Sequence, residues 1–250
     1  MRMSKKMKKV AAIILTLAMM FGVFGISGME VTVKASDNPV KMYYCDHVLS
    51  YHGSATITVY VQVDSRNAAN RQVYIHHSGF GSGDWEDVEA TYVTKLDGNT
   101  EIWKATIIGF ETSLKYAIKY IGDGKVYWDN NNGNDYTYNN VLGIANVKAG
   151  RLYKVYSSKV MMFATVKNLA YNKNVKVRYT TDNWATYKDE SLDYLSNTTD
   201  TNDELWSVEL DLDGGKTDGF HFCISYEVNG QTYWDNNFGA NYDLSYNCNR

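Results

Sequence analysis

The chain has 250 residues, enough for one large domain or for two of about 100 residues each. Its 44% hydrophobic residues, 21% charged residues and formal net charge of −3 exclude a disordered polyelectrolyte. Because 21 Tyr, 6 Trp and 19 Gly accompany a single Pro, many short strands joined by tight turns are predicted.

Residues 1–35 have the pattern of a secretory signal peptide. A basic segment before Val10 leads into an apolar stretch that ends near Met29. Val33-Lys34-Ala35 before Ser36 then forms a small-residue cleavage site. A retained membrane anchor is the alternative, but glycines interrupt the stretch. We expect export, with cell-surface association left open and no membrane contact after cleavage. Cleavage would leave 19 basic and 27 acidic residues, a net charge of −8, so no nucleic-acid partner is expected.

The rest of the sequence contains an internal repeat at an offset of 106 residues. YWDNNNGNDY begins at Tyr127 and YWDNNFGANY begins at Tyr233, and the match continues backwards without a gap. Each copy has three Trp in the same order, which are Trp85, Trp103 and Trp128 in the first copy and Trp184, Trp206 and Trp234 in the second. We therefore expect two modules, at residues 36–142 and 143–250.

Apolar residues alternate within each copy with the period of a half-buried strand. The predicted strands are 55–63, 73–77, 101–108, 114–121 and 125–128 in the first copy, and 160–166, 175–179, 204–212, 220–228 and 231–234 in the second. Gly, Asn and Asp turns separate them, and no convincing helix is present, so the fold class is all-β with a β-sandwich in each half. Trp103 and Trp206 lie inside alternating strands and are expected in the cores.

The repeated W-D-N-N segment suits the binding of a neutral sugar. Trp128 and Trp234 end a strand just before a polar loop, where an indole face is available to the apolar C–H face of a glucose ring. The neighbouring amides offer donors and acceptors to hydroxyls, and they belong to Asn130, Asn131, Asn236 and Asn237. Trp85 and Trp184 lie in turns and would add a second platform to each copy. The alternative is a tight turn in which Asp and Asn bond their own backbone.

Other chemistries fit less well. The loop beginning at Asp129 lacks the Gly and Glu positions of a calcium loop, and the His residues show no metal-ligand spacing, so neither a metal nor a cofactor is expected. Glycoside hydrolysis needs two carboxylates at one bond, whereas Asp129 and Asp235 supply one in each copy. His77 ends a strand eight residues before Trp85 and is a candidate to line the same site, with a core or edge role as the alternative. The three Cys cannot all pair.

Two stretches of the second copy resemble carbohydrate-binding module family 21, the starch- and glycogen-binding module of fungal glucoamylase and of glycogen-targeting phosphatase subunits. They are VKNLAYNKNVKVRYTTDNW, from Val166 to Trp184, and YEVNGQTYWDNNFGANY, from Tyr226 to Tyr242. The first copy shares WDNNNG, and its VYIHHSGFGSGDW is similar to the bacterial starch-binding families 25 and 53. The resemblance implies immunoglobulin-like β-sandwiches that bind α-1,4-linked glucan.

The resemblance also implies which residues bind. They are Trp184, Trp234, Asn236, Asn237 and Tyr242 in the second copy and Trp85, Trp128, Asn130, Asn131 and Tyr136 in the first, and our candidate set adds Asp129, Asp235 and His77. Phe238 replaces the third Asn of the first copy, so a hydroxyl contact made there is absent from the second.

We therefore expect an exported, non-catalytic protein that binds starch, glycogen or maltooligosaccharides at two sites acting by avidity. Secreted amylases or a cell-surface complex are further partners to consider. An α-glucan-active enzyme with a site between the modules and a surface assembly protein are the alternatives. The phosphatase-docking pattern of a basic residue, Val, any residue and Phe does not occur.

Overall fold

The computed structural model describes residues 38–49, 52–66, 70–79, 83–156, 158–212 and 219–246. The expected signal peptide, residues 1–35, lies outside them. The regular structure of the described residues consists of strands and short 3-10 turns, which confirms the all-β fold class. No helix in the described part is long and apolar enough to cross a membrane.

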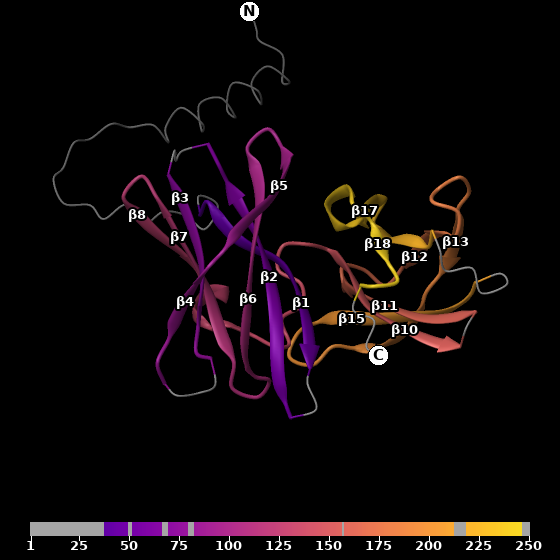
Figure 1. Cartoon of the computed structure of the whole chain (residues 1–250), viewed down its shortest axis with the longest axis horizontal. Coiled ribbons are helices and arrows are strands. Elements are labelled where there is room, and N and C mark those ends of the chain that lie inside the picture. Colours follow the sequence, from indigo (N-terminus) through magenta and orange to yellow (C-terminus); the bar gives the residue numbers. More distant parts are fainter. Residues whose placement is uncertain are drawn as a thin grey trace, which may run out of the picture. The chain divides into compact units, whose positions relative to one another are not determined.

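Strands β1–β9 form the first module, in which two antiparallel sheets share one hydrophobic core (Figure 1). The first sheet has the order β1-β2-β6-β5, with β1 at Val40–Leu49, β2 at Ser54–Asp64, β6 at Thr100–Phe110 and β5 at Thr91–Asp97. The second has the order β4-β3-β7-β8 with β9 also paired to β7, where β4 is Glu86–Glu89, β3 Arg71–His77, β7 Lys115–Gly122, β8 Lys125–Asp129 and β9 Tyr136–Thr137. Alternate residues of β2 from Ala55 to Val63 are fully buried, as their spacing predicts.

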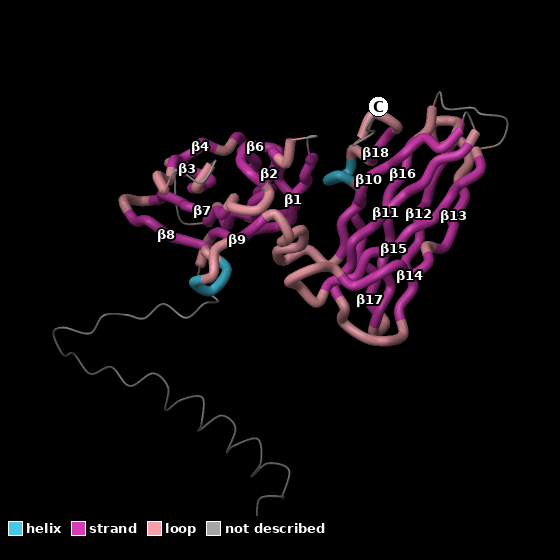
Figure 2. Tube along the Cα trace, turned by 90° about the horizontal axis from the view of Figure 1, so that it is seen from below, coloured by secondary structure: helices cyan, strands magenta, loops and turns pink. Residues whose placement is uncertain are grey.

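Strands β10–β18 form the second module on the same plan, around a core of its own (Figure 2). One sheet has the order β10-β11-β15-β14, with β10 at Val147–Tyr156, β11 at Lys159–Lys167, β15 at Asp203–Asp211 and β14 at Asp193–Asn197. The other has the order β13-β12-β16-β17 with β18 also paired to β16, where β13 is Lys188–Ser191, β12 Lys173–Thr180, β16 His221–Val228, β17 Gln231–Asp235 and β18 Tyr242–Asp243.

The 106-residue repeat is preserved in strand register. In the first module β7 pairs with β8 so that Lys119 lies opposite Trp128, and in the second β16 pairs with β17 so that Ser225 lies opposite Trp234. Each hairpin therefore ends in a Trp-Asp pair and enters its Asn-rich loop in the same orientation.

The sequence pattern missed eight strands, β1, β4, β5, β9, β10, β13, β14 and β18. β9 and β18 are two residues long, too short to show a period of two. Most residues of β4, β5, β13 and β14 are exposed, so these strands carry no apolar alternation to detect. In β1 and β10 the register shifts between Met42 and Tyr44 and between Ala149 and Leu152, and such bulges interrupt the period of two.

Trp103 and Trp206, expected in the cores, pack against them while remaining partly exposed. Each indole Nε1 donates a hydrogen bond at 3.0 Å to the carboxylate two residues earlier, Glu101 or Glu204. Each half-buried indole N–H therefore has a polar partner.

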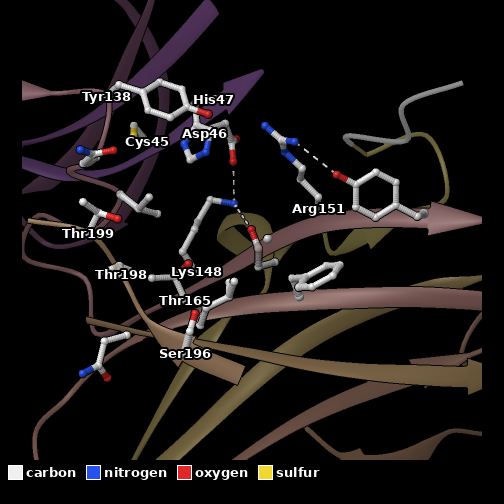
Figure 3. Close-up of a pocket in the computed structure, with 18 residues that line it drawn as sticks. Cys45, Asp46, His47, Tyr138, Lys148, Arg151, Thr165, Ser196, Thr198 and Thr199 are labelled. Carbon is white, nitrogen blue, oxygen red and sulfur yellow. Dashed lines mark hydrogen bonds and ion pairs between the residues drawn. The ribbon is translucent and has the colours of Figure 1, made fainter. Parts of the chain in front are cut away.

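The two modules meet around Lys148, whose side chain is 1% exposed. Its Nζ lies 2.8 Å from Asp46 of the first module (Figure 3) and 3.8 Å from Asp235 of the second. It also faces the rings of Tyr44 and Tyr242. Burial acts to lower the pKa of Lys148, but the two carboxylates outweigh it and raise the pKa. A charged, buried lysine therefore connects the modules.

Phe238 makes a second contact between the modules. Its ring lies 5.6, 5.5 and 5.6 Å from the rings of Tyr43, Tyr44 and Tyr60, which belong to the first module. The φ of Phe238 is +55°, a left-handed backbone that bulky residues rarely adopt, while its counterpart Asn132 has φ +57° and is exposed. The third Asn of the motif has thus been exchanged for an aromatic residue that fills the junction.

A cavity of about 440 Å³ lies beside Lys148, lined by both modules (Figure 3). Its lining includes Asp46, His47, Arg151 and Thr198. Burial lowers the pKa of His47 to about 4, and the charge of Arg151 acts in the same direction. An enzyme with its site between the modules predicts two carboxylates here, whereas Asp46 is the single carboxylate among the described lining residues and it is paired with Lys148.

Candidate functional site

The outer face of β3, β4, β7 and β8 carries three rings in contact, here called the first aromatic face: Trp85, His76 and Trp128. Trp85 stacks on His76 with ring centroids 5.0 Å apart, and Trp128 meets His76 edge-on at 5.3 Å. Asp87 orients this set, because it lies 2.7 Å from His76 Nδ1 and accepts a bond at 2.6 Å from Lys119 Nζ. The face brings together two indoles that are 43 residues apart in sequence.

The second module repeats this arrangement with different side chains. Its second aromatic face consists of Tyr187, Arg178 and Trp234. The guanidinium of Arg178 lies 4.2 Å from the ring of Tyr187 and 5.3 Å from that of Trp234, and both distances are within cation–π range. Two hydrogen bonds of 2.7 and 2.8 Å fix Arg178 on Asp189, and this pairing keeps the pKa of Asp189 below its usual value.

Strand register shows which residues of the two faces correspond. His76 pairs with Asp87 across β3 and β4, and Arg178 pairs with Asp189 across β12 and β13. Because Trp85 and Tyr187 each lie two residues before that Asp, Tyr187 is the counterpart of Trp85. The sequence comparison matched Trp184 to Trp85, which the register corrects.

Trp184 belongs to a tight turn instead. It has φ +69° and is half-buried, and its N–H donates to Oγ1 of Thr180 at 3.0 Å. Asp182 holds the turn together by accepting bonds from Thr180 and Thr186, which lower the pKa of Asp182 to about 2. Among the described residues, the cation–π contacts of Arg178 are with Tyr187 and Trp234, and Trp184 is not one of its partners.

The two Asn-rich loops follow Trp128 and Trp234 as 3-10 turns, Asn131–Gly133 and Asn237–Gly239. Asn130 and Asn236 accept a bond at 3.0 Å from the N–H of the following Gly, and Nδ2 of Asn131 and Asn237 donates to the backbone four residues later at 3.0 and 3.1 Å. Half of each amide is therefore used by the turn, as the tight-turn alternative predicts. The other half, Nδ2 of the first Asn and Oδ1 of the second, has no described protein partner and is left for a ligand.

The Asp and the final Tyr of each repeated motif hold the Asn-rich loop on its sandwich. Tyr136 donates to Asp129 at 2.9 Å and Tyr242 donates to Asp235 at 2.8 Å, and each carboxylate also accepts a backbone N–H of β1 or β10 at 2.7 or 2.6 Å. Tyr136 and Tyr242 are 8% and 3% exposed, and Asp235 is buried as well. The expectation that these tyrosines contact sugar is therefore corrected, because their rings face the interior and their hydroxyls are already paired.

His77 is also turned away from the aromatic face. It is 2% exposed, its Nδ1 accepts a bond from the N–H of Gly79 at 3.1 Å, and its Nε2 lies 3.5 Å from Glu86. Burial lowers the pKa of His77, which favours the neutral ring. Alternation along β3 explains the correction, because residues 73, 75 and 77 face inward whereas His76 faces outward.

Each aromatic face leaves one indole accessible at the surface. The central side chain keeps its two flanking rings from packing on each other, and the carboxylate behind it fixes its direction. Trp128 and Trp234 are 43% and 44% exposed, so an apolar face of each remains accessible beside the free amide groups of its loop. This combination of indole surface and neutral hydrogen-bonding groups suits a polyol better than an ion.

Comparison with known families agrees with this chemistry. Residues 146–245 match the model of the carbohydrate/starch-binding module of family 21. The second module therefore resembles the carbohydrate-binding module of family 21, as its sequence motifs predicted. The match covers the second aromatic face and its Asn-rich loop, and the likeness of the first module to families 25, 53 and 21 stays a prediction.

Curated relatives match over a short segment. Protein phosphatase 1 regulatory subunit 3C of Rattus norvegicus is 41% identical over 82 residues, which cover 32% of this chain and 26% of that protein. Subunit 3B of Homo sapiens is 40% identical over 32% of this chain and 29% of that protein. Glycogen-binding subunit 76A of Drosophila melanogaster is 35% identical over a segment that covers 31% of this chain and 12% of that protein. The chain spans less than a third of the length of these relatives.

Two solved structures are each similar to 40% of the chain. The starch-binding domain of Rhizopus oryzae glucoamylase, in complex with β-cyclodextrin and maltoheptaose, shares 30% identity over 40% of this chain and 92% of that domain, with a TM-score of 0.33. The carbohydrate-binding module of the muscle glycogen-targeting subunit of protein phosphatase-1 shares 30% identity over 40% of this chain and 74% of its own, also with a TM-score of 0.33.

Proposed function

We propose that the protein is an exported, non-catalytic binder of α-1,4-glucan that uses one aromatic face in each module. The observation that carries the proposal is the recurrence of one arrangement, two aromatic rings on either side of a carboxylate-held planar group, at the same strand positions of both modules. The family 21 match supports carbohydrate as the ligand of the second face.

Two weak sites on one chain favour a polymer over a short sugar. Each hydroxyl contact replaces one with water, so the net gain per hydrogen bond is only about 1 kcal/mol. Two sites that engage the same polymer act at high effective concentration, and avidity then exceeds either affinity by about 10²-fold or more. Starch and glycogen present many equivalent chains to both faces.

Retention on insoluble starch tests the proposal. Trp85→Ala with Trp128→Ala removes the first face, Tyr187→Ala with Trp234→Ala removes the second, and the quadruple variant removes both. Each pair should lower the bound fraction, and the quadruple variant should bind no more than a protein without such modules. The matched control is Phe110→Ala with Tyr156→Ala, one exposed aromatic from each module that lies outside the faces.

Full binding by the quadruple variant would show that the faces are not the glucan sites. Release of reducing sugar from amylose by the unaltered chain would favour the enzyme alternative. The relatives are named as subunits of protein phosphatase 1, so that phosphatase is a second candidate partner, and co-precipitation with its catalytic subunit tests it. We expect no co-precipitation, because an exported chain would not meet that phosphatase. Export itself is tested by finding the chain, cleaved near residue 35, outside the producing cell.

A further inference from the structure

A groove enclosing about 300 Å³ runs from the second aromatic face toward the first module. Trp234 and Asn236 line it from the second module, and Tyr43 and Leu96 line it from the first. Its volume falls at the lower end of the range for small-ligand sites, about 300–1,000 Å³. Residues from both modules therefore surround the place where the second glucan site begins.

The walls of this groove are held in place by the junction. Phe238, which also lines it, lies among the rings of Tyr43, Tyr44 and Tyr60, and Asp235 at its base accepts bonds from Tyr242 and the backbone of β10. A site bounded by fixed walls loses less conformational entropy when a ligand binds than one that must assemble.

The side chains facing the groove suit a glucosyl unit. Leu96 is 42% exposed and supplies an aliphatic wall, while Trp234 offers an indole. The hydroxyl of Tyr43 and Nδ2 of Asn236 have no described protein partner, and burial raises the pKa of Tyr43, so its hydroxyl stays protonated and able to donate. Apolar surface with a few neutral polar groups matches the alternating C–H and hydroxyl surfaces of a sugar chain.

The Asn-rich loop of the first module has no aromatic residue at the position that Phe238 occupies in the second module. Asn130, Asn132 and Gly133 are exposed there, and Asn132 stands where the second module has Phe238. We propose that the second glucan site is a composite of the two modules, in which Tyr43 and Leu96 of the first module hold an α-glucan chain against Trp234 and Asn236 of the second. This inference rests on the proposed function and makes the two sites unequal.

The test uses the full chain carrying Trp85→Ala and Trp128→Ala, so that the second site remains, with maltoheptaose as the ligand in calorimetric titration. Adding Leu96→Ala should weaken binding about fivefold, because an exposed aliphatic wall is lost. Adding Tyr43→Phe isolates the hydroxyl and should weaken binding by a smaller factor. Ile108→Ala, an exposed aliphatic residue of the same sheet outside the groove, is the matched control and should change affinity less than twofold.

The outcomes separate the composite site from the function itself. If Leu96→Ala and Tyr43→Phe bind like the Ile108→Ala control while Trp234→Ala loses binding, the composite site is wrong and glucan binding stands. If Trp234→Ala also leaves binding unchanged, the second face is not a glucan site. Leu96 is exposed and Tyr43→Phe keeps the ring, so an unchanged unfolding temperature in both variants shows that the junction is intact.

Discussion

Tyr187 stands in the second module where Trp85 stands in the first. Each lies two residues before the Asp that orients the central side chain, and each packs on that side chain, Arg178 or His76. The resemblance to family 21 had pointed to Trp184 instead. The two assignments lead to different results in a binding experiment.

Tyr187→Ala should weaken glucan binding by the second module more than Trp184→Ala does. Tyr187 and Trp234 share the guanidinium of Arg178, whereas Trp184 is half-buried in a turn. Loss of one stacking ring lowers affinity about tenfold, the effect expected for a contact worth about 1–1.5 kcal/mol. Titration with maltoheptaose, in a chain whose first face has been removed, measures both. A larger effect of Trp184→Ala would restore the assignment made from the sequence.

Tyr242→Phe should lower stability and leave glucan affinity unchanged. Its hydroxyl donates to buried Asp235 and is also a partner of Lys148, so the variant leaves charged groups short of a hydrogen bond. The expected loss is about 1.5–3 kcal/mol in the free energy of unfolding by urea. Tyr136→Phe is the parallel change in the first module. A fall in glucan affinity without a fall in stability would show that Tyr242 contacts the sugar directly.

Lys148→Met should be among the most destabilising single changes in the chain. It leaves Asp46 and Asp235 in the junction without their shared cation, and breaking a buried pair in this way costs about 3–5 kcal/mol. Lys159→Met, which breaks an exposed pair with Glu209, is the control and should cost much less, because solvent screens that pair. Urea unfolding at neutral pH compares the two, and equal effects would show that the junction adds little to stability.

Stability should fall as the pH is lowered from 6.5 to 4, in part through His47. Its folded pKa is about 4 against 6.5 for the free side chain, so between these values the unfolded chain binds a proton that the folded chain does not. Acidification therefore favours unfolding, by up to about 3 kcal/mol at pH 4. His47→Gln should flatten the profile over this interval, and His52→Gln, at an exposed position, should not.

Most of the scaffold was predictable from the sequence, because buried strands such as β2 alternate strictly and the 106-residue repeat fixes the hairpins that end at Trp128 and Trp234. The outward position of His76 was also present in that alternation, and its 11-residue spacing to Asp87 recurs between Arg178 and Asp189. Both signals identify Tyr187 as the counterpart of Trp85, whereas the order of the Trp residues alone pairs Trp85 with Trp184.

The junction was not predictable in the same way. Lys148 lies at the start of an apparently ordinary strand, and its partners Asp46 and Asp235 are about 100 and 90 residues away in sequence. Nothing local distinguishes a buried cation from a solvated one before the fold brings those carboxylates together. The burial of Tyr136 and Tyr242 has the same cause, because it depends on β1 and β10 approaching the motif's Asp residues.

The buried lysine at the junction also affects how the tandem can be dissected or recombined. A second module excised at residue 143 would keep Lys148 but lose Asp46, and Phe238 would have no tyrosine rings to cover it. Such a fragment would expose the ring of Phe238 to solvent and would leave Lys148 with Asp235 as one of its two carboxylate partners. The second module is therefore poorly portable, and chimaeras that graft it onto other proteins should include the strand that bears Asp46.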